Sequence, residues 1–403
     1  MAYTKREILE YIEQENVKFI RLAFCDVFGV QKNIAITASE LERAFEHGVE
    51  FDPSAITGFA SAAKTNLRLF PDPATLTVLP WRPSTGRVIR FFCNIFHPDG
   101  KPFEADCRRI LRLAADEAEQ NGLKCSFGSK FEFYLFKTDE SGNPTDEPHD
   151  YCGYLDVAPL DKGENIRREI VLTLEEMGMK PESSHHEDGP GQNEVDFRGA
   201  DAPQAADNAV TFKNVVSTIA ALNGLYADFS PKPMPDTNGN GFHINVSVSP
   251  REDERVRDAF AAGILEHICQ ITAFLNPTEE SYKRLGRLKA PKYITWTAEN
   301  WPQLMRIPSL DDAGSIELRS ADCEANPYLA FALIIHAGID GVKRGLELPA
   351  PTNRSINELQ NAPAGTKTLP QSLQQAGRCA SGSELVSRVI PECVLSAYVT
   401  GRR

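Results

Sequence analysis

Strands in which polar and apolar side chains alternate place the strongest constraint on the fold of this chain. Four segments show the pattern: SKFEFYLF (129–136), NEVDFRG (193–199), GFHINVSV (241–248) and SIELRS (315–320). Successive side chains of a strand point to opposite faces, so each segment has one apolar face and one polar face. The alternation therefore predicts an antiparallel sheet that packs its apolar face on a core.

The polar faces of these segments are rich in Glu, His and Arg, whereas ordinary solvated faces carry mostly Lys, Thr, Ser and Gln. In chain order the polar residues are Lys130, Glu132, Glu194, Asp196, Arg198, His243, Asn245, Ser247, Glu317 and Arg319. A solvated face explains any one segment taken alone. Four such faces together favour a site for a hard cation and a phosphate, because carboxylate oxygens are the ligands of such cations.

A further group of acids lies in the segment HHEDGPGQNE (185–194). Its Gly-Pro-Gly turn brings the carboxylates of Glu187 and Glu194 to one point. Because His185 and His186 are adjacent, they point to opposite faces of an extended chain, and the sequence favours Mg²⁺ or Mn²⁺ over Zn²⁺. One of the two histidines is expected to be packed or hydrogen-bonded.

Composition limits the classes of protein to which the chain can belong. With 403 residues, 41% of them hydrophobic, it predicts one large and one small domain. The net charge of −13 argues against nucleic acid or an anionic membrane as the main partner. Nine cysteines without a C-x-x-C pair, a charged N-terminus and the lack of a long apolar run predict a cytoplasmic protein. They also predict no membrane span and no structural zinc.

The first hundred residues have a pattern of their own. Residues 4–15 predict an amphipathic helix, 18–36 two extended segments that turn near Gly29, and 39–48 a second helix. Residues 51–81 show little periodicity and predict a long ordered loop. A new helical pattern at 107–122 follows a turn-rich stretch, so the domain boundary is expected near residue 98. The predicted domains are residues 1–98 and 99–403.

Several motifs, all in the same order, resemble those of the glutamine synthetase family over almost the whole chain. They are FDPSAI (51–56), LFPDPATLTVLPW (69–81), SSHHEDGPGQNEVDFR (183–198), NGNGFHINVS (238–247), SYKRL (281–285) and SIELRSADCEANPYLA (315–330). The resemblance implies an α+β fold. It consists of an N-terminal β-grasp domain and a glutamine synthetase catalytic domain whose antiparallel sheet forms an active-site funnel.

The same resemblance implies substrates, metals and assembly. The expected substrates are ATP, glutamate and ammonia or an amine, and the expected metal is Mg²⁺ or Mn²⁺. Homo-oligomeric rings are expected, with a dodecamer as the expected assembly. In such rings the loop that carries Asp52 completes the active site of a neighbouring subunit.

Residue roles follow from the motifs one position at a time. The resemblance implies a first metal site at Glu132, Glu187 and Glu194, and a second at His243 and Glu317. It implies a glutamate site at Asn238, Gly239, His243, Arg284 and Arg319. Asp52 matches the acid that binds ammonium, and Arg306 matches an arginine that faces the transferring phosphoryl group.

The first departure from the family pattern is Lys130, which stands where a metal-binding glutamate is expected. A protonated lysine repels a divalent ion and cannot bind it, so the second metal is expected to be weakened or lost. Two interpretations stay open. Lys130 cradles phosphates as a P-loop lysine does, or it pairs with Glu317 and marks a decayed site.

The second departure lies in the segment GRLKAP (286–291), one residue shorter than its counterpart in the family. Lys289 replaces a glutamate that attracts and deprotonates ammonium, a role that a cation opposes. Trp301 replaces an arginine near the nucleotide phosphates, and Lys64 and Asn66 replace acids in the loop of Asp52. The changes predict an amine other than ammonia, neutral or acidic rather than a cationic polyamine.

The sequence therefore favours an ATP-dependent ligase that forms a γ-glutamyl amide through γ-glutamyl phosphate. Lys130 and Lys289 also motivate an alternative, a catalytically impaired homologue with a binding, regulatory or structural role. A third hypothesis is phosphorylation of a carboxylate or guanidine without amide formation.

Overall fold

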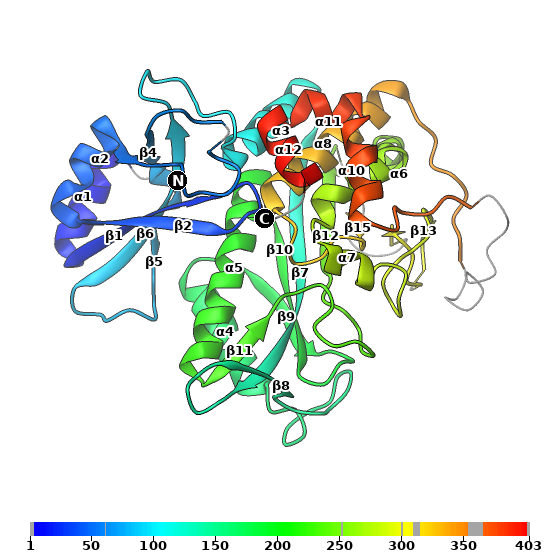
Figure 1. Ribbon diagram of the computed structural model, residues 1–403, viewed down its shortest axis with the longest axis horizontal. Helices are drawn as coiled ribbons and strands as arrows, with labels where there is room; N and C mark the ends of the chain where they lie inside the picture. The colour runs from blue at the N-terminus through cyan, green and yellow to red at the C-terminus, as the bar shows by residue number, and fades with distance from the viewer. Residues whose placement is uncertain are drawn as a thin grey trace.

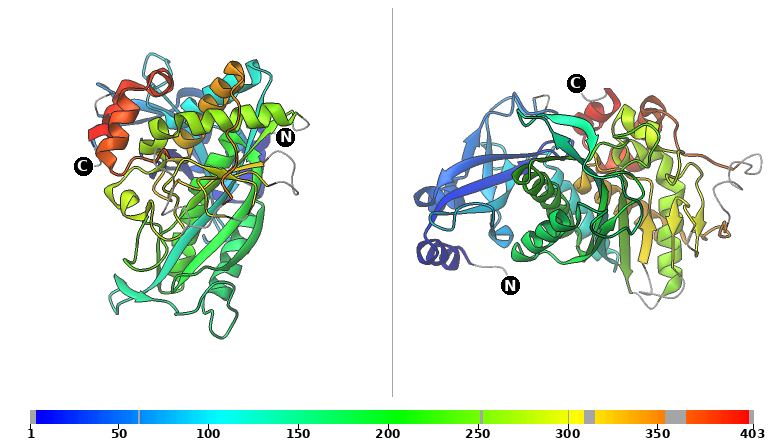
Figure 2. Two further views of the ribbon diagram at one scale, coloured as in Figure 1. Left: turned by 90° about the vertical axis from the view of Figure 1, so that its right-hand side faces the viewer. Right: turned by 90° about the horizontal axis from the view of Figure 1, so that it is seen from below.

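The computed structural model describes residues 4–60, 62–250, 253–299, 301–308, 315–353 and 366–400. It shows two bodies of secondary structure, with the N-terminal strands at one side of the catalytic sheet and its helices (Figures 1 and 2). The predicted α+β fold is confirmed.

The N-terminal domain is built on a mixed sheet with the strand order β2-β1-β6-β4-β3, and β5 pairs with β6. Its elements are α1 (Lys5–Gln14), β1 (Val17–Cys25), β2 (Gln31–Thr37), η1 (Ala38–Glu40), α2 (Leu41–His47), β3 (Val49–Phe51), β4 (Leu67–Pro71), η2 (Pro73–Thr75), β5 (Thr77–Val78) and β6 (Arg87–Phe96). Both predicted helices are present. The predicted turn between β1 and β2 is also present, with Gly29 at a φ of 78°, a conformation that favours glycine.

The prediction of a single loop over residues 51–81 is wrong in part. The segment contains β4, η2 and β5. β4 is only five residues long, and it is held by pairing with β3 and β6, which lie far from it in sequence. Contacts of this kind leave little local periodicity, so the sequence pattern did not reveal the strand.

The catalytic sheet has the order β13-β14-β15-β12-β7-β10-β9, and β8 and β11 pair with β7. Its strands are β7 (Lys124–Thr138), β8 (Pro144–Pro148), β9 (Pro181–His186), β10 (Gln192–Asp201), β11 (Leu225–Asp228), β12 (Phe242–Ser249), β13 (Trp296–Thr297), β14 (Met305–Arg306) and β15 (Ser315–Leu318). The four predicted strands are therefore direct neighbours, and they pair antiparallel.

The helices of the domain that holds this sheet are α3 (Cys107–Gln120), α4 (Glu164–Glu176), α5 (Ala202–Leu222), α6 (Glu254–Leu275), α7 (Glu279–Arg284), α8 (Pro327–Arg344), α10 (Leu373–Ser381), α11 (Glu384–Val389) and α12 (Glu392–Thr400). The helices α3, α5 and α6 pack on the sheet, and α8 packs on α3 and α6, whereas α7 carries Arg284 to the pocket on the polar face. Phe131 of β7 stacks on Phe242 of β12 with ring centroids 4.4 Å apart, and Phe127 stacks on Phe331 of α8 at 4.3 Å. The apolar alternate positions thus form the core and leave the polar positions on the other face.

One helix in the described part of the chain, α6, is long and apolar enough to cross a membrane. However, 72% of its most apolar window is buried inside the fold. This burial is typical of the core helix of a globular domain.

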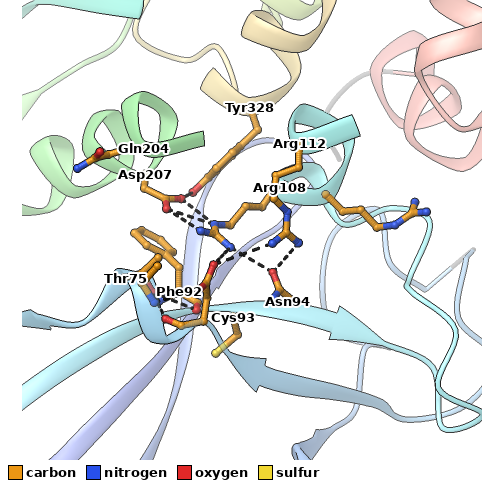
Figure 3. Close-up of polar contacts among 12 residues, drawn as sticks. Thr75, Phe92, Cys93, Asn94, Arg108, Arg112, Gln204, Asp207 and Tyr328 are labelled. Carbon is orange, nitrogen blue, oxygen red and sulfur yellow. Dashed lines mark hydrogen bonds and ion pairs between the residues drawn. The ribbon is translucent and has the colours of Figure 1, made fainter. Parts of the chain in front are cut away.

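A buried ionic network joins the two domains (Figure 3). Arg108 of α3 donates to both carboxylate oxygens of Asp207 on α5 and to Asp72 of the N-terminal domain at 2.8 Å. The hydroxyl of Tyr328 donates to Asp207 at 2.7 Å. The network fixes α3, α5 and the N-terminal sheet relative to one another.

We expect Asp207→Asn to lower the free energy of unfolding by about 3 kcal/mol, because it leaves the buried charge of Arg108 without its main partner. The measurement is the midpoint of urea unfolding. Asp99→Asn is the matched control, since Asp99 forms an exposed pair with Lys101 and its loss should change the midpoint little. An equal effect of the two substitutions would show that the network does not stabilise the domain junction.

Candidate active site

An open pocket of about 450 Å³ lies over the polar face of the catalytic sheet. Its walls come from the strands β14, β15, β12, β7, β10 and β9, from α7 and from loops beside these elements. Every site residue expected from the sequence lines this pocket, with the exception of Asp52. The fold therefore brings these side chains to one cavity.

Three glutamates lie close together in the pocket. Glu132 and Glu194 are paired across β7 and β10, and Glu187 lies in the turn between β9 and β10. Ligand atoms of Glu194 lie within 4.8 Å of those of Glu132 and His243, and also of those of His185 and Glu187. Burial, and then the charge of neighbouring carboxylates, raises the pKa of Glu132 and of Glu194. A divalent cation relieves this repulsion, and such oxygen donors suit Mg²⁺ or Mn²⁺.

The adjacent histidines of β9 differ in their contacts. His185 Nε2 lies 3.0 Å from Glu187 Oε1 and 3.9 Å from Glu194 Oε1. His186 is fully buried, with its Nε2 2.9 Å from Asp150 Oδ1. The sequence reasoning missed His185 as a member of the site. The alternation that separates the two histidines also puts His185 on the same face as Glu187, so the sequence pattern alone could have placed His185 in the site.

Lys130 lies beside the carboxylates. Its Nζ is 3.5 Å from Oδ2 of Asp196, its partner in the register of β7 and β10. Burial disfavours the charged amine, but Asp196, Glu194 and Glu317 outweigh it and raise the pKa of Lys130. The amine therefore stays protonated. Of the two interpretations left open for Lys130, the ion pair with Glu317 is not formed, because Lys130 pairs with Asp196 and Glu317 pairs with two arginines.

These arginines and a third one give the pocket its positive charge. Arg306 Nε lies 3.3 Å and Arg319 Nη1 lies 3.5 Å from Glu317 Oε2. Arg284 is buried, and its Nη1 donates to the carbonyl of Ser320 at 2.9 Å. Guanidinium groups held in this way suit carboxylates and phosphates, which they bind through two donors at once.

His243 lies between the carboxylates and the arginines. Its Nε2 is 3.7 Å from Glu132 Oε1, and its Nδ1 is 3.8 Å from Glu317 Oε1. Burial, and then the charges of Arg319 and Arg284, lowers the pKa of His243 well below its usual value. The imidazole is therefore neutral, which is the form that binds metals.

Two glycines allow the loop before β12 to approach the site. A Cβ on Gly239 would lie 2.2 Å from the carbonyl oxygen of Pro231, and one on Gly241 would lie 2.8 Å from His243 Nε2. The backbone contact excludes any side chain at position 239, and a side chain at position 241 would displace His243 or Arg284. The atoms around the NGNG segment thus favour glycine at positions 239 and 241.

A partly exposed salt bridge forms another part of the pocket. Lys289, in the segment after α7, pairs with Asp188, which also accepts a hydrogen bond from Asn238 Nδ2 at 3.0 Å. Burial disfavours the charge of Lys289, but Asp188 outweighs it and raises the pKa of the amine. The ammonium lies 5.3 Å from the ring centroid of Tyr154, and Trp301 also lines the pocket.

A second cavity of about 620 Å³ adjoins the first. Both cavities are lined by Lys130, Arg306 and Glu317. Asn245 and Ser247 of β12 line only the second cavity. Two ligands, one in each cavity, would therefore meet at the three shared side chains.

Comparison with known families agrees with this arrangement. The family model described as glutamine synthetase, beta-Grasp domain, matches residues 16–98, and that described as glutamine synthetase, catalytic domain, matches residues 104–403. The chain belongs to the glutamine synthetase family. The fold expected from the sequence, a β-grasp domain followed by a glutamine synthetase catalytic domain, is confirmed.

The chain is also similar in sequence to individual glutamine synthetases over nearly their whole length. A glutamine synthetase of Methanosarcina mazei is 43% identical, with 99% of this chain and 93% of the relative covered. One of Clostridium saccharobutylicum is 41% identical, with 99% and 94% covered. Since glutamine synthetases are ligases, the chain is assigned to this class of enzyme, and the alternative of an impaired homologue gains no support.

Solved structures with this fold include two of GmaS. A complex of GmaS with ADP superimposes with a TM-score of 0.88 at 27% identity and covers 99% of this chain and 94% of GmaS. GmaS without ligand gives a TM-score of 0.85 at 28% identity, with 98% and 94% covered. Each superposition therefore includes both domains of the chain.

Asp52 does not line the 450 Å³ pocket of its own chain. It is exposed in the N-terminal domain and accepts a hydrogen bond from the backbone N–H of Ser54 at 2.8 Å, which lowers the pKa of the carboxyl group. Its action on the site of a neighbouring subunit stays a prediction.

Proposed function

We propose that this ligase uses ATP to join the γ-carboxylate of glutamate to ammonia or an amine through γ-glutamyl phosphate. The observation that carries the proposal is the pair of adjoining cavities that share Lys130, Arg306 and Glu317. ATP in the larger cavity and glutamate in the smaller would bring the γ-phosphoryl group to the γ-carboxylate at these side chains. The likeness to GmaS, solved with ADP, supports the use of a nucleotide.

The proposed reaction has two steps. An oxygen of the γ-carboxylate attacks the γ-phosphorus of ATP, and ADP leaves. The amine nitrogen then attacks the acyl carbon of γ-glutamyl phosphate, phosphate leaves with the bonding electrons, and the amine loses a proton. The first step turns a poor electrophile into a reactive one. Binding in adjoining cavities supplies the orientation that both steps need.

The side chains of the pocket are assigned to substrates by their charge. The proposed glutamate site consists of Asn238, Gly239, His243, Arg284 and Arg319. Arg306 and Lys130, which face both cavities, would stabilise the negative charge on the phosphoryl oxygens during transfer. Asp52 of a neighbouring subunit would orient or deprotonate the amine.

The crowded carboxylates fit a divalent cation. Glu132, Glu187 and Glu194 would hold Mg²⁺ or Mn²⁺, which when bound supplies positive charge to the phosphoryl oxygens. His243 and Glu317 form the second set, but the protonated amine of Lys130 on the same face disfavours another ion there. We therefore propose one strongly held cation per chain.

The chain is proposed to have two domains and to assemble into rings. Residues 1–98 and 99–403 form the two proposed domains, and the buried network of Arg108 lies at their junction. Rings of identical subunits, expected to be dodecamers, and a cytoplasmic location are proposed from the family resemblance.

Lys289 is proposed to select the acceptor. Its ammonium group, together with Arg284 and Arg319, surrounds the amine side with positive charge and disfavours a cationic acceptor. A neutral or acidic amine is therefore expected to be a better acceptor than ammonium or a polyamine.

Replacement of Lys289 by glutamine is expected to raise kcat/KM for ammonium about tenfold, because it removes a cation and leaves the carboxylate of Asp188 without its partner. The measurement is phosphate release at varied ammonium concentration. Lys283→Gln serves as the matched control, since Lys283 forms an exposed pair with Glu280 on α7. If the two variants show the same kcat/KM, Lys289 does not control acceptor choice.

The proposed function is tested by phosphate release from ATP in the presence of glutamate and Mg²⁺ or Mn²⁺, first with ammonium and then with a panel of amines. Phosphate release that depends on an amine, with a γ-glutamyl amide as product, is the expected result. A stable phosphorylated product without an amide would instead indicate a kinase, and no release with any acceptor would contradict the ligase proposal.

A further inference from the structure

A cavity at the domain junction lies outside the proposed active site. It has a volume of about 800 Å³. One wall is formed by η2, β5 and β6 of the N-terminal domain, and the other by α3, the first half of α5, the start of β7 and the turn after α4. It shares no lining residue with the two cavities of the active site. The cavity is therefore a separate candidate binding site.

Arg90 of β6 is the unusual group in this wall. Its side chain is 95% buried, with a relative exposure of 5%. Its guanidinium lies 4.3 Å from the ring centroid of Phe92, and burial lowers its pKa. Among the described residues, no hydrogen-bond acceptor contacts its Nε and no carboxylate lies within ion-pair distance of its guanidinium, although the charge of Asp207 partly offsets the effect of burial. A buried charge without an anionic partner is costly, so a ligand that supplies one would be stabilised there.

Two acids that line the same cavity as Arg90, Asp72 and Asp207, are already engaged, and Figure 3 shows the contacts of Asp207. Asp207 accepts hydrogen bonds from Arg108 and Tyr328, and Asp72 accepts one from Arg108. Arg112 donates to Asn94 at 2.6 Å. The carboxylates of the network are therefore paired with Arg108 and Tyr328 rather than with Arg90.

A second arginine of the cavity also lacks an anionic partner among the described residues. Arg109 of α3 is half-buried, and in the described part of the chain its guanidinium has no hydrogen-bond or ion-pair partner. The N-terminal turn of α5, with Ala202 and Gln204, also lines the cavity. This N-terminus is already capped, because the carboxylate of Asp201 accepts a hydrogen bond from the backbone N–H of Gln204 at 3.0 Å. The arginines are therefore the groups of the cavity that favour an anion. Three exposed acids also line the cavity: Asp116, Glu119 and Asp201.

We propose that this cavity binds a small anionic effector whose carboxylate or phosphate group contacts Arg90, with Arg109 as the second contact. The planar fork of a guanidinium matches both anions. The volume suits a small metabolite. Because its walls come from both domains, the bound anion stabilises the arrangement of the N-terminal sheet against α3 and α5 and raises the melting temperature.

The test is titration of the assembled protein with succinate and, separately, with inorganic phosphate, followed by calorimetry and by melting temperature. Both anions can also enter the active site, so each titration is repeated with Arg319→Gln, which removes a cation from that site alone. We expect at least one anion to bind the wild type and Arg319→Gln with similar Kd. We expect the same anion to bind Arg90→Met at least tenfold more weakly.

Arg90→Met retains the apolar packing on Phe92, and unchanged basal phosphate release would show that it is folded. If it fails to assemble, Arg109→Gln on the surface of α3 decides, with an expected weakening of at least threefold. Binding of succinate alone identifies a carboxylate ligand, and binding of phosphate alone a phosphorylated one. Binding that is lost in Arg319→Gln, or retained in both cavity variants, would overturn the proposal, as would no binding by the wild type.

Discussion

Glu132→Ala is expected to lower glutamate-dependent phosphate release from ATP by about 1000-fold, the upper range for removal of one group that stabilises a transition state. Glu132 faces Glu194 across two strands, and its Oε2 accepts a hydrogen bond from the backbone N–H of Gly241 at 2.8 Å. Its loss removes a proposed ligand of the cation and a contact that holds the loop before β12. The measurement is kcat with saturating Mn²⁺ and ATP.

Glu147→Ala is the matched control, because Glu147 lies on the neighbouring strand β8 and forms an exposed pair with Lys137 of β7. It should leave kcat unchanged. Calorimetry with Mn²⁺ supplies a second readout that does not depend on turnover. Glu132→Ala should lose the tight binding of Mn²⁺ that the wild type and Glu147→Ala retain. Full activity of Glu132→Ala would contradict the proposal that Glu132 binds the cation.

The strands of the site were predictable because their pattern is local. Alternation at 129–136, 193–199, 241–248 and 315–320 fixes which residues share a face, and burial of the apolar positions fixes the register. Once these strands pair as neighbours, their polar side chains must meet. The family motifs predicted the loop residues of the site, which show no alternation. An example is NGNG, where a Cβ on a glycine would collide with surrounding atoms.

The features that the sequence did not reveal depend on contacts between distant segments. β4 exists because β3 and β6 pair with it. Lys130 pairs with Asp196 because the register of β7 and β10 sets them opposite each other, and Asp188 meets Lys289 from a segment far along the chain. The cavity of Arg90 needs the packing of two domains. No local pattern encodes these partners.

Lys130→Met is expected to lower kcat for phosphate release by about 100-fold, because it removes a protonated amine that faces both cavities. Lys137→Met is the matched control on the same strand, since Lys137 pairs with Glu147 at the exposed end of β7. The control should retain full activity. Normal activity of Lys130→Met would support the interpretation that Lys130 marks a decayed metal site.

Lys130→Glu separates charge from metal binding. A carboxylate at this position would stand beside His243 in the register and on the same face as Glu317, and would complete three donors for a second cation. The number of Mn²⁺ ions bound per chain, measured by calorimetry, is expected to rise from about one to about two. Recovery of activity at high Mn²⁺ would show that the amine of Lys130 replaces an ion. A stoichiometry that stays at one would show instead that the repulsion of Lys130 is not what excludes the second cation, since Arg306 and Arg319 still hold Glu317.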